Sequence, residues 1–159
     1  MDEAFITHYI THAFQGVETI EADGTTFFFY NPRGDIPPDY KFPFVTLVTN
    51  DFNDTASDLN RPSIFRLNIG VSKETYRSLF GPQPPPLDAS GMVNTGHDFT
   101  ALDQLMPHPV YAPQSWICVL NPTTTTFQKV TELLAEAYQR TADKHKKRGS
   151  THIGEQSAD

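Results

Sequence analysis

The chain has 159 residues, a formal net charge of −7 at pH 7 and one cysteine, Cys118. This length suits a single domain with a buried core, and one cysteine excludes an internal disulfide. An acidic chain repels a phosphate backbone, so a nucleic-acid partner is not expected. No apolar run reaches the roughly 20 residues that span a bilayer. The start MDEAFITHY lacks a basic and apolar leader, so we expect a cytoplasmic protein without a membrane partner.

The first half of the chain predicts one helix and three strands. Residues 1–15 place apolar side chains at helical spacing, which predicts an amphipathic helix. Residues 17–21 and 25–30 flank the turn sequence Ala-Asp-Gly and predict a β-hairpin. Residues 44–49 are almost all apolar and predict a third strand.

Residues 65–81, FRLNIGVSKETYRSLFG, predict a strand followed by a short helix. Apolar residues alternate with Arg66, Asn68 and Gly70, which is typical of a strand with one apolar face. Ser72 is suited to cap the first turn of the helix, and Gly81 is suited to end it.

The second half predicts an insert, two short strands and a long helix. Residues 81–98 contain four prolines and three glycines, which indicates a mobile insert. Residues 108–112 and 115–120 predict strands, and residues 126 to about 146 predict the last helix. We therefore expect one α+β domain over residues 1–148, with 149–159 as a disordered tail. Its antiparallel sheet of five to six strands would carry the N-terminal, middle and C-terminal helices on one face.

These segments resemble the MmcQ/YjbR-like (CyaY-like) α+β domains over about residues 1–147. The similar features are the strand TTFFFY, the unit FRLNIGVSKETYRSLFG, the hairpin HPVYAPQSWICVL and a closing helix with Tyr138. The chain looks closer still to an uncharacterised branch with the FRLNIGVS core and the HPVYAPQSW hairpin. The resemblance implies the fold, and it implies a double-wing DNA-binding module as one alternative function.

The strongest candidate site lies on the polar side of the sheet. Arg66 and Asn68 share one strand face about 7 Å apart, beside the hairpin expected to carry His108. Arg66 is suited to bind a carboxylate or enolate, and His108 to move a proton near neutral pH. In the alternative interpretation, Arg66 only pairs with an acid such as Asp58. The candidate catalytic residues are His108, Arg66 and Tyr111, and the candidate substrate-binding residues are Asn68, Trp116 and Tyr76.

This pattern predicts a protein that binds a small oxygenated organic ligand, as a monomer or homodimer. As an enzyme it would be a cofactor-independent isomerase, cyclase or dehydratase. No cofactor is expected, because NPRGD and GPQPPP lack the spacing and the lysine of a phosphate-binding loop. A non-catalytic partner-docking protein is the other alternative.

Four further features have simpler interpretations. His8 and His12 are four residues apart on a helix, but no third metal ligand is evident, so no metal is expected. The acidic loop that contains Asp54 and the basic run 144–148 are interpreted as solvated surface. Cys118 lies inside a strand and is interpreted as a buried apolar residue.

Overall fold

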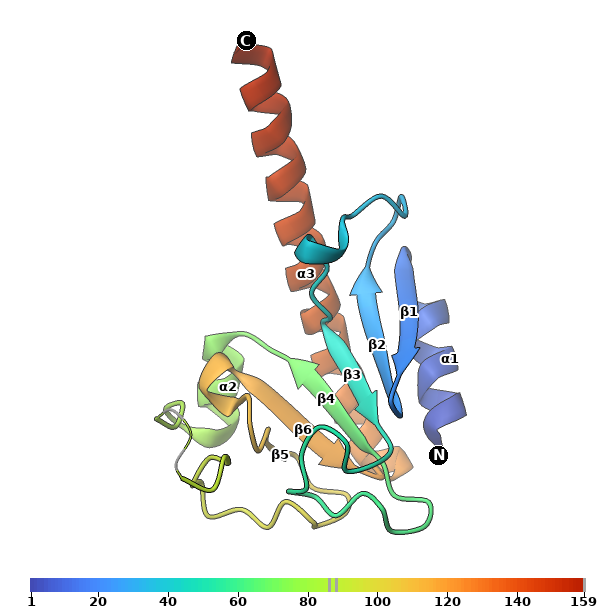
Figure 1. The fold of residues 1–159 in the computed structure, drawn as a ribbon, viewed down its shortest axis with the longest axis vertical. Helices are drawn as coiled ribbons and strands as arrows, with labels where there is room; N and C mark the ends of the chain where they lie inside the picture. Colours follow the sequence, from blue (N-terminus) through green and yellow to red (C-terminus); the bar gives the residue numbers. More distant parts are fainter. Residues whose placement is uncertain (86, 88, 159) are drawn as a thin grey trace.

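Within the part of the chain that the structure describes, six antiparallel strands form one sheet and three α-helices cover one of its faces (Figure 1). The computed structural model describes residues 1–85, 87 and 89–158, with side chains as far as residue 147. The helices are α1 (Glu3–Ala13), α2 (Lys73–Phe80) and α3 (Thr124–Ala158), with short 3-10 turns η1 (Pro38–Tyr40) and η2 (Ala112–Gln114). The strands are β1 (Val17–Ala22), β2 (Thr25–Tyr30), β3 (Val45–Val48), β4 (Arg66–Gly70), β5 (Met106–Pro107) and β6 (Trp116–Leu120).

The strand order is β1-β2-β3-β4-β6-β5. The expected α+β fold, with an antiparallel sheet of five to six strands and a long C-terminal helix, is therefore confirmed. Local signals explain the element boundaries. Asp2 accepts a hydrogen bond from the amide of Phe5 at the start of α1, and Ser72 accepts one from Thr75 at the start of α2. These caps satisfy amides that have no partner within the helix.

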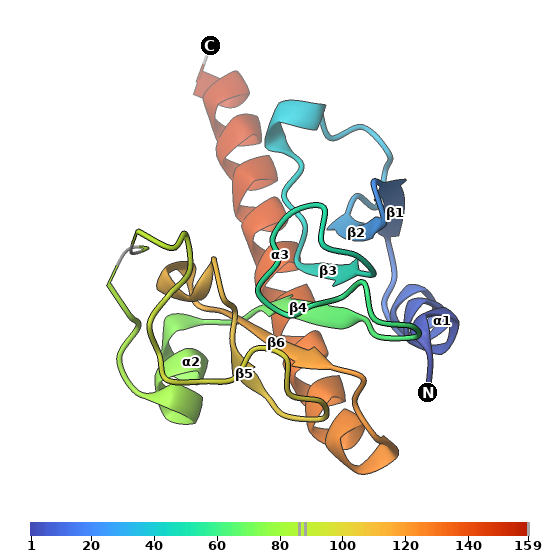
Figure 2. The same ribbon diagram turned by 60° about the horizontal axis from the view of Figure 1, so that its bottom comes forward.

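Side-chain alternation along the strands separates the two faces of the sheet. Leu67 and Ile69 of β4 point toward the helices and pack in the main core with Ile6 of α1 and Leu134 of α3. The view in Figure 2 shows α1 and α3 against this face, which we call the helix face. Arg66 and Asn68, one residue out of step, must therefore lie on the opposite face.

The opposite face is partly covered by long loops. Leu59 of the loop between β3 and β4 packs against Met106, Cys118 and Leu120 in a second, smaller core. We call this the loop face. The segment between α2 and β5, expected to be a mobile insert, is anchored by Val93, which is buried and donates from its amide to the carbonyl of Pro109 at 2.8 Å.

Two boundaries differ from expectation. Residues 108–111 form a tight turn rather than a strand, because Pro109 has no amide hydrogen and the amides of Val110 and Tyr111 bind a side chain instead of a neighbouring strand. Helix α3 runs to Ala158, through the segment 149–158 where we expected a disordered tail. Extending an existing helix needs no new nucleus, so the helix continues along the chain. No helix of the described residues has the length and apolar character needed to cross a membrane.

Candidate functional site

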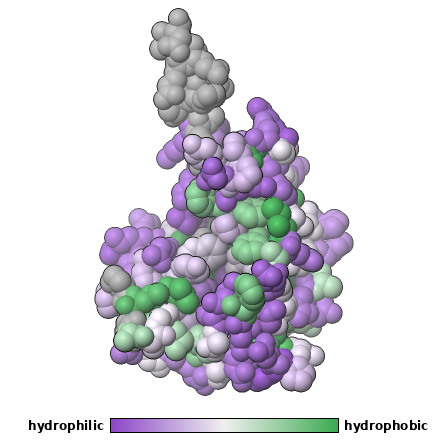
Figure 3. Space-filling view, viewed as in Figure 1, coloured by the Kyte–Doolittle hydropathy of each residue, from purple (hydrophilic) through white to green (hydrophobic). Residues whose placement is uncertain are grey.

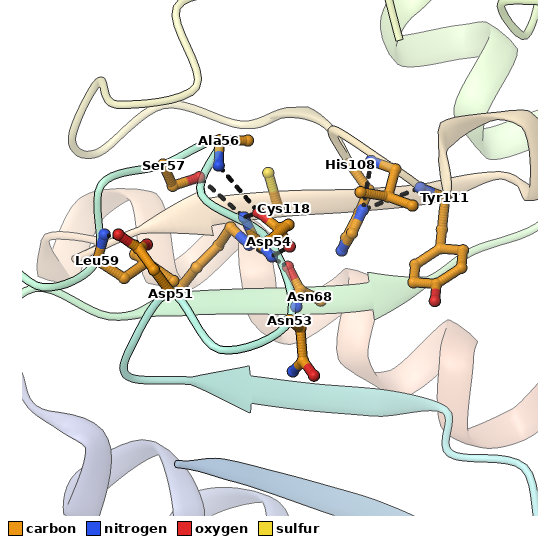
Figure 4. A network of polar contacts seen from close by, with 12 residues as sticks. Asp51, Asn53, Asp54, Ala56, Ser57, Leu59, Asn68, His108, Tyr111 and Cys118 are labelled. Atoms are coloured by element: carbon orange, nitrogen blue, oxygen red, sulfur yellow. Dashed lines mark hydrogen bonds and ion pairs between the residues drawn. The ribbon is translucent and has the colours of Figure 1, made fainter. Parts of the chain in front are cut away.

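A hollow of about 500 Å³ opens on the loop face of the sheet. Its floor comes from neighbouring strands, because Phe27, Thr46 and Asn68 lie directly opposite one another in the register of β2, β3 and β4. Its sides come from the loop that carries Asp54 and from the turn that carries His108 (Figure 4). This volume falls within the range of small-molecule sites. We call it the aromatic hollow.

The structure brings five of the six candidate residues together here. Arg66, Asn68, His108, Tyr111 and Trp116 all line the aromatic hollow, although the chain separates Arg66 from His108 by 42 positions.

Tyr76 is the exception. It is 1% exposed and packs in the core on the helix face, with its ring 5.5 Å from that of Phe80. The apolar stripe of a short helix faces the core, so Tyr76 has a packing role and is not part of this site.

Arg66 is held by a dense set of hydrogen bonds. Its Nη1 and Nη2 atoms donate to the two carboxylate oxygens of Asp54 at 3.0 and 2.7 Å. Nη1 also donates to Ser57 Oγ at 2.9 Å, and Nε donates to Asn68 Oδ1 at 3.0 Å. Four of the five N–H groups of a guanidinium are thereby used. Arg66 does pair with an acid, as the alternative interpretation held, but the partner is Asp54 rather than Asp58.

The Asp54–Arg66 pair leaves little net charge in the hollow. Burial of Asp54 opposes its ionisation, but the hydrogen bonds and positive charge of Arg66 outweigh this, so the pKa of Asp54 lies below its usual value. Arg66 is 1% exposed and its charge is already compensated. The expectation that Arg66 anchors a free carboxylate or enolate is therefore revised, because Arg66 instead positions Asn68.

Asn68 connects Arg66 to Thr46 through two hydrogen bonds of its side-chain amide. Its amide nitrogen donates to Thr46 Oγ1 at 3.0 Å, while its amide oxygen accepts from Arg66. The orientation of the amide is fixed by these two bonds, since oxygen faces the guanidinium and nitrogen faces the hydroxyl. The Thr46 hydroxyl therefore accepts from Asn68 and keeps its own hydrogen to donate.

One ring nitrogen of His108 hydrogen-bonds to the protein backbone, and the other faces the hollow. Nδ1 accepts hydrogen bonds from the amides of Val110 and Tyr111, both at 3.0 Å. An acceptor Nδ1 requires the proton of the neutral ring to be on Nε2. Among the described residues, Nε2 has no protein partner, and Figure 4 shows it pointing away from the turn. No buried side-chain nitrogen or oxygen of these residues lacks a partner, so Nε2 is open to the hollow. The ring is 3% exposed and lines the hollow, so it presents a fixed N–H donor.

The charge state of His108 differs from expectation. Burial and the nearby positive charge of Arg66 lower the pKa of His108 to about 3, although Asp54 acts in the opposite direction. The imidazole is therefore neutral at pH 7 and does not take up a proton near neutrality. A neutral, positioned imidazole can still polarise a carbonyl oxygen by donating a hydrogen bond.

Aromatic side chains form the walls and mouth. The indole of Trp116 lies against Gly70, where an added Cβ would be 3.1 Å from two ring atoms. Phe42 and Tyr111 are 67% and 54% exposed at the edge of the hollow. In the space-filling view of this face, hydrophobic side chains gather over β2 and β3 on a mostly hydrophilic surface (Figure 3). The walls and mouth of the hollow are therefore largely aromatic.

Sequence reasoning missed several members of this site. Asp54 and Ser57 belong to a polar loop that was interpreted as solvated surface, and Thr46 and Phe27 were counted only as strand residues. No local signal identifies them, because their roles depend on which strand and loop lie beside Arg66. The period-2 pattern of β2 and β3 would have placed Phe27 and Thr46 on the loop face, had the register been known.

Cys118 and the pair His8 and His12 are the other reactive side chains considered from the sequence. Cys118 is fully buried on the loop face, and burial raises the pKa of its thiol to about 12, so it stays protonated, as suits its interpretation as an apolar residue. His8 and His12 stack at 3.7 Å, and His12 Nδ1 binds the carbonyl of His8. In the described part of the chain, no group of three or more His, Cys, Asp or Glu side chains is arranged to hold a metal.

Comparison with known proteins identifies a family but no activity. Residues 1–150 match the model of DUF6194, a family of unknown function, and the chain belongs to this family. No curated protein and no solved structure matches the chain. The function must therefore be inferred from the site.

Proposed function

We propose that this DUF6194 protein is a cytoplasmic small-molecule-binding protein that holds a flat, oxygenated organic ligand in the aromatic hollow. The observation that supports this most is the Nε2–H of His108, a donor without a protein partner among the described residues, in a side chain that is 3% exposed. No buried side-chain nitrogen or oxygen of the described residues lacks a partner, so this N–H is open to the hollow. A ligand oxygen there can accept its hydrogen bond in place of solvent.

The charges of the hollow select the ligand class. Asp54 compensates Arg66, and His108 is neutral, so the ligand group that enters need not be charged. Desolvating a charged ligand without a free counter-charge would be costly. A ketone, lactone or enone with an attached ring fits the donor at His108 and the stacking surface of Trp116.

Cofactor-independent chemistry is the enzymatic form of this proposal. Hydrogen bonding from His108 to a carbonyl oxygen would stabilise the negative charge that develops on it during isomerisation, cyclisation or dehydration. Asp54 is the only carboxylate among the described residues that line the hollow. Its lowered pKa makes it a weak base, so binding without turnover is the simpler form.

A matched pair of ligands and a matched pair of variants test the binding. The ligand 1-tetralone has a carbonyl oxygen, and tetralin has the same rings without it. Trp116 is the only tryptophan in the chain and lines the hollow, so its fluorescence reports binding beside it, and the His108 variant assigns that binding to this hollow. We expect 1-tetralone to bind about 2- to 10-fold more tightly than tetralin, which is the range of one neutral hydrogen bond.

The variant His108→Asn should remove this preference. An asparagine oxygen occupies a position close to that of Nδ1, so it can still accept from Val110 and Tyr111, but its amide nitrogen lies near the position of Cδ2 and does not replace the donor at Nε2. The control His108→Gln places an amide near Nε2 and loses the acceptor for the turn. We expect His108→Asn to fold and bind both ligands equally. A retained preference for 1-tetralone in His108→Asn would contradict the proposal.

A further inference from the structure

A second hollow, of about 510 Å³, lies on the other side of Trp116. It is formed where the loop that carries η1 lies beside α3, an arrangement visible in both ribbon views (Figures 1 and 2). Trp116, Phe42 and Pro43 line both hollows and form the partition between them. The proposed function makes no use of this second hollow, which we call the basic hollow.

The lining of the basic hollow is positively charged, whereas the whole chain is acidic. Lys41, Arg140, Lys144 and His145 line the basic hollow, and no aspartate or glutamate is among its lining residues. The whole chain has a formal net charge of −7. Lysine and arginine side chains of one sign around a concave surface concentrate anions there. The basic run 144–148 of α3, interpreted from the sequence as solvated surface, thus has its first member, Lys144, in a hollow.

Hydrogen bonds to the backbone hold the Arg140 side chain in place without a ligand. Its Nη1 atom donates to the backbone carbonyls of Gly70 and Val71 at 3.1 and 2.8 Å. Among the described residues, its Nε and Nη2 groups have no protein partner. These groups form the edge of a guanidinium that can bind two oxygens of a carboxylate or phosphate in parallel.

The two lysines of the basic hollow differ in the net positive charge that they add to it. Lys41 pairs with Glu18 at 3.0 Å, so its charge is largely compensated. Lys144 is exposed and makes no ion pair among the residues that the structure describes. Arg140 and Lys144, one turn apart on α3, therefore supply the net positive charge. The acids Glu136 and Asp143 of the same helix bind Thr75 and Gln139 instead.

We propose that the basic hollow binds the oxyanion group of a small organic carboxylate or phosphate ester. Arg140 binds the oxyanion through its free edge, and Lys144 adds a second charge. Tyr30, Phe44 and Trp116 supply apolar and aromatic surface for the organic part. Anion binding here does not require a ligand in the aromatic hollow.

Three small probes and the fluorescence of Trp116 test the proposal. Benzoate and phenyl phosphate represent the two sources of an oxyanion, and benzamide is the uncharged match for benzoate. We expect at least one anion to bind with an affinity that falls as salt increases, and benzamide to bind more weakly. Failure of both anions to bind at about 10 mM, or equal binding of benzamide, would overturn the proposal.

The variants locate the anion. Lys144→Gln should weaken binding about threefold, as for an exposed charge. The matched control Lys146→Gln removes the same charge from the same helix, but Lys146 does not line the hollow, so it should bind as the wild type does. Arg140→Lys keeps the positive charge but loses the bidentate donor edge of the guanidinium. It should weaken binding more than Lys144→Gln does. Thermal unfolding checks that it folds.

Two results of the same experiment would contradict this location. Equal losses in Lys144→Gln and Lys146→Gln would mean a diffuse charge effect rather than a site. A loss in His108→Asn as large as that in Lys144→Gln would place the anion in the aromatic hollow instead.

Discussion

Arg66 and Asp54 form a bidentate ion pair on the loop face of the sheet, with N–O distances of 3.0 and 2.7 Å. The pair connects β4 to the loop between β3 and β4 and orients Asn68 through Arg66 Nε. It leaves the floor of the aromatic hollow nearly neutral. This pair decides both the stability of the site and the ligands that suit it.

Breaking this pair should destabilise the fold strongly. Asp54→Asn leaves the Arg66 charge buried without a counter-charge, and we expect the free energy of unfolding to fall by about 3–5 kcal/mol. The control is Asp58→Asn, whose carboxylate is 61% exposed and lies 3.8 Å from Arg61. That change should cost less than about 1 kcal/mol. Urea unfolding measures both, and similar losses in the two variants would show that Arg66 does not depend on Asp54.

Acid should destabilise the protein through His108. The unfolded residue takes up a proton below pH 6.5, whereas the folded one does so only near pH 3. Between these values the unfolded state binds more protons, so stability falls as pH falls, by up to about 1.4 kcal/mol per pH unit. His108→Asn lacks this contribution and should lose less stability between pH 7 and pH 4. Parallel pH dependences of the two proteins would mean that His108 titrates normally when folded.

An alanine at Gly70 should move the partition between the two hollows. The added Cβ would lie 3.1 Å from Trp116 ring atoms, so the indole must shift. We expect a changed emission maximum of Trp116 and a stability cost of about 1–3 kcal/mol from overpacking. Binding of 1-tetralone and of benzoate should both change, because Trp116 lines both hollows. An unaltered emission spectrum would show that the indole does not depend on Gly70.

The thiol of Cys118 should be unreactive in the folded protein. It is fully buried, its pKa is raised to about 12, and it donates weakly to the carbonyl of Pro107 at 3.6 Å. The thiolate is the reactive form, so a thiol reagent such as dithionitrobenzoate should label the protein only as fast as it unfolds. Adding urea should raise the labelling rate in parallel with unfolding. Labelling at the rate of an exposed cysteine would contradict the buried position.

Much of the fold was predictable from sequence because its signals are local. The strand and helix of residues 65–81 depend on side-chain period, a capping Ser72 and a terminating Gly81, all within a few residues of where they act. The same alternation placed Arg66 and Asn68 together on one face. The resemblance to the MmcQ/YjbR-like domains stays a prediction.

The sequence by itself thus determined which residue types share the loop face and that helices cover the other face. Only the tertiary structure decided that Asp54 neutralises Arg66, that the turn holds His108 neutral with one N–H directed into a hollow, and that Tyr76 lies in the core. The physical reason is that burial and charge pairing depend on neighbours far apart in the chain. Side-chain period depends only on the residue's own strand or helix.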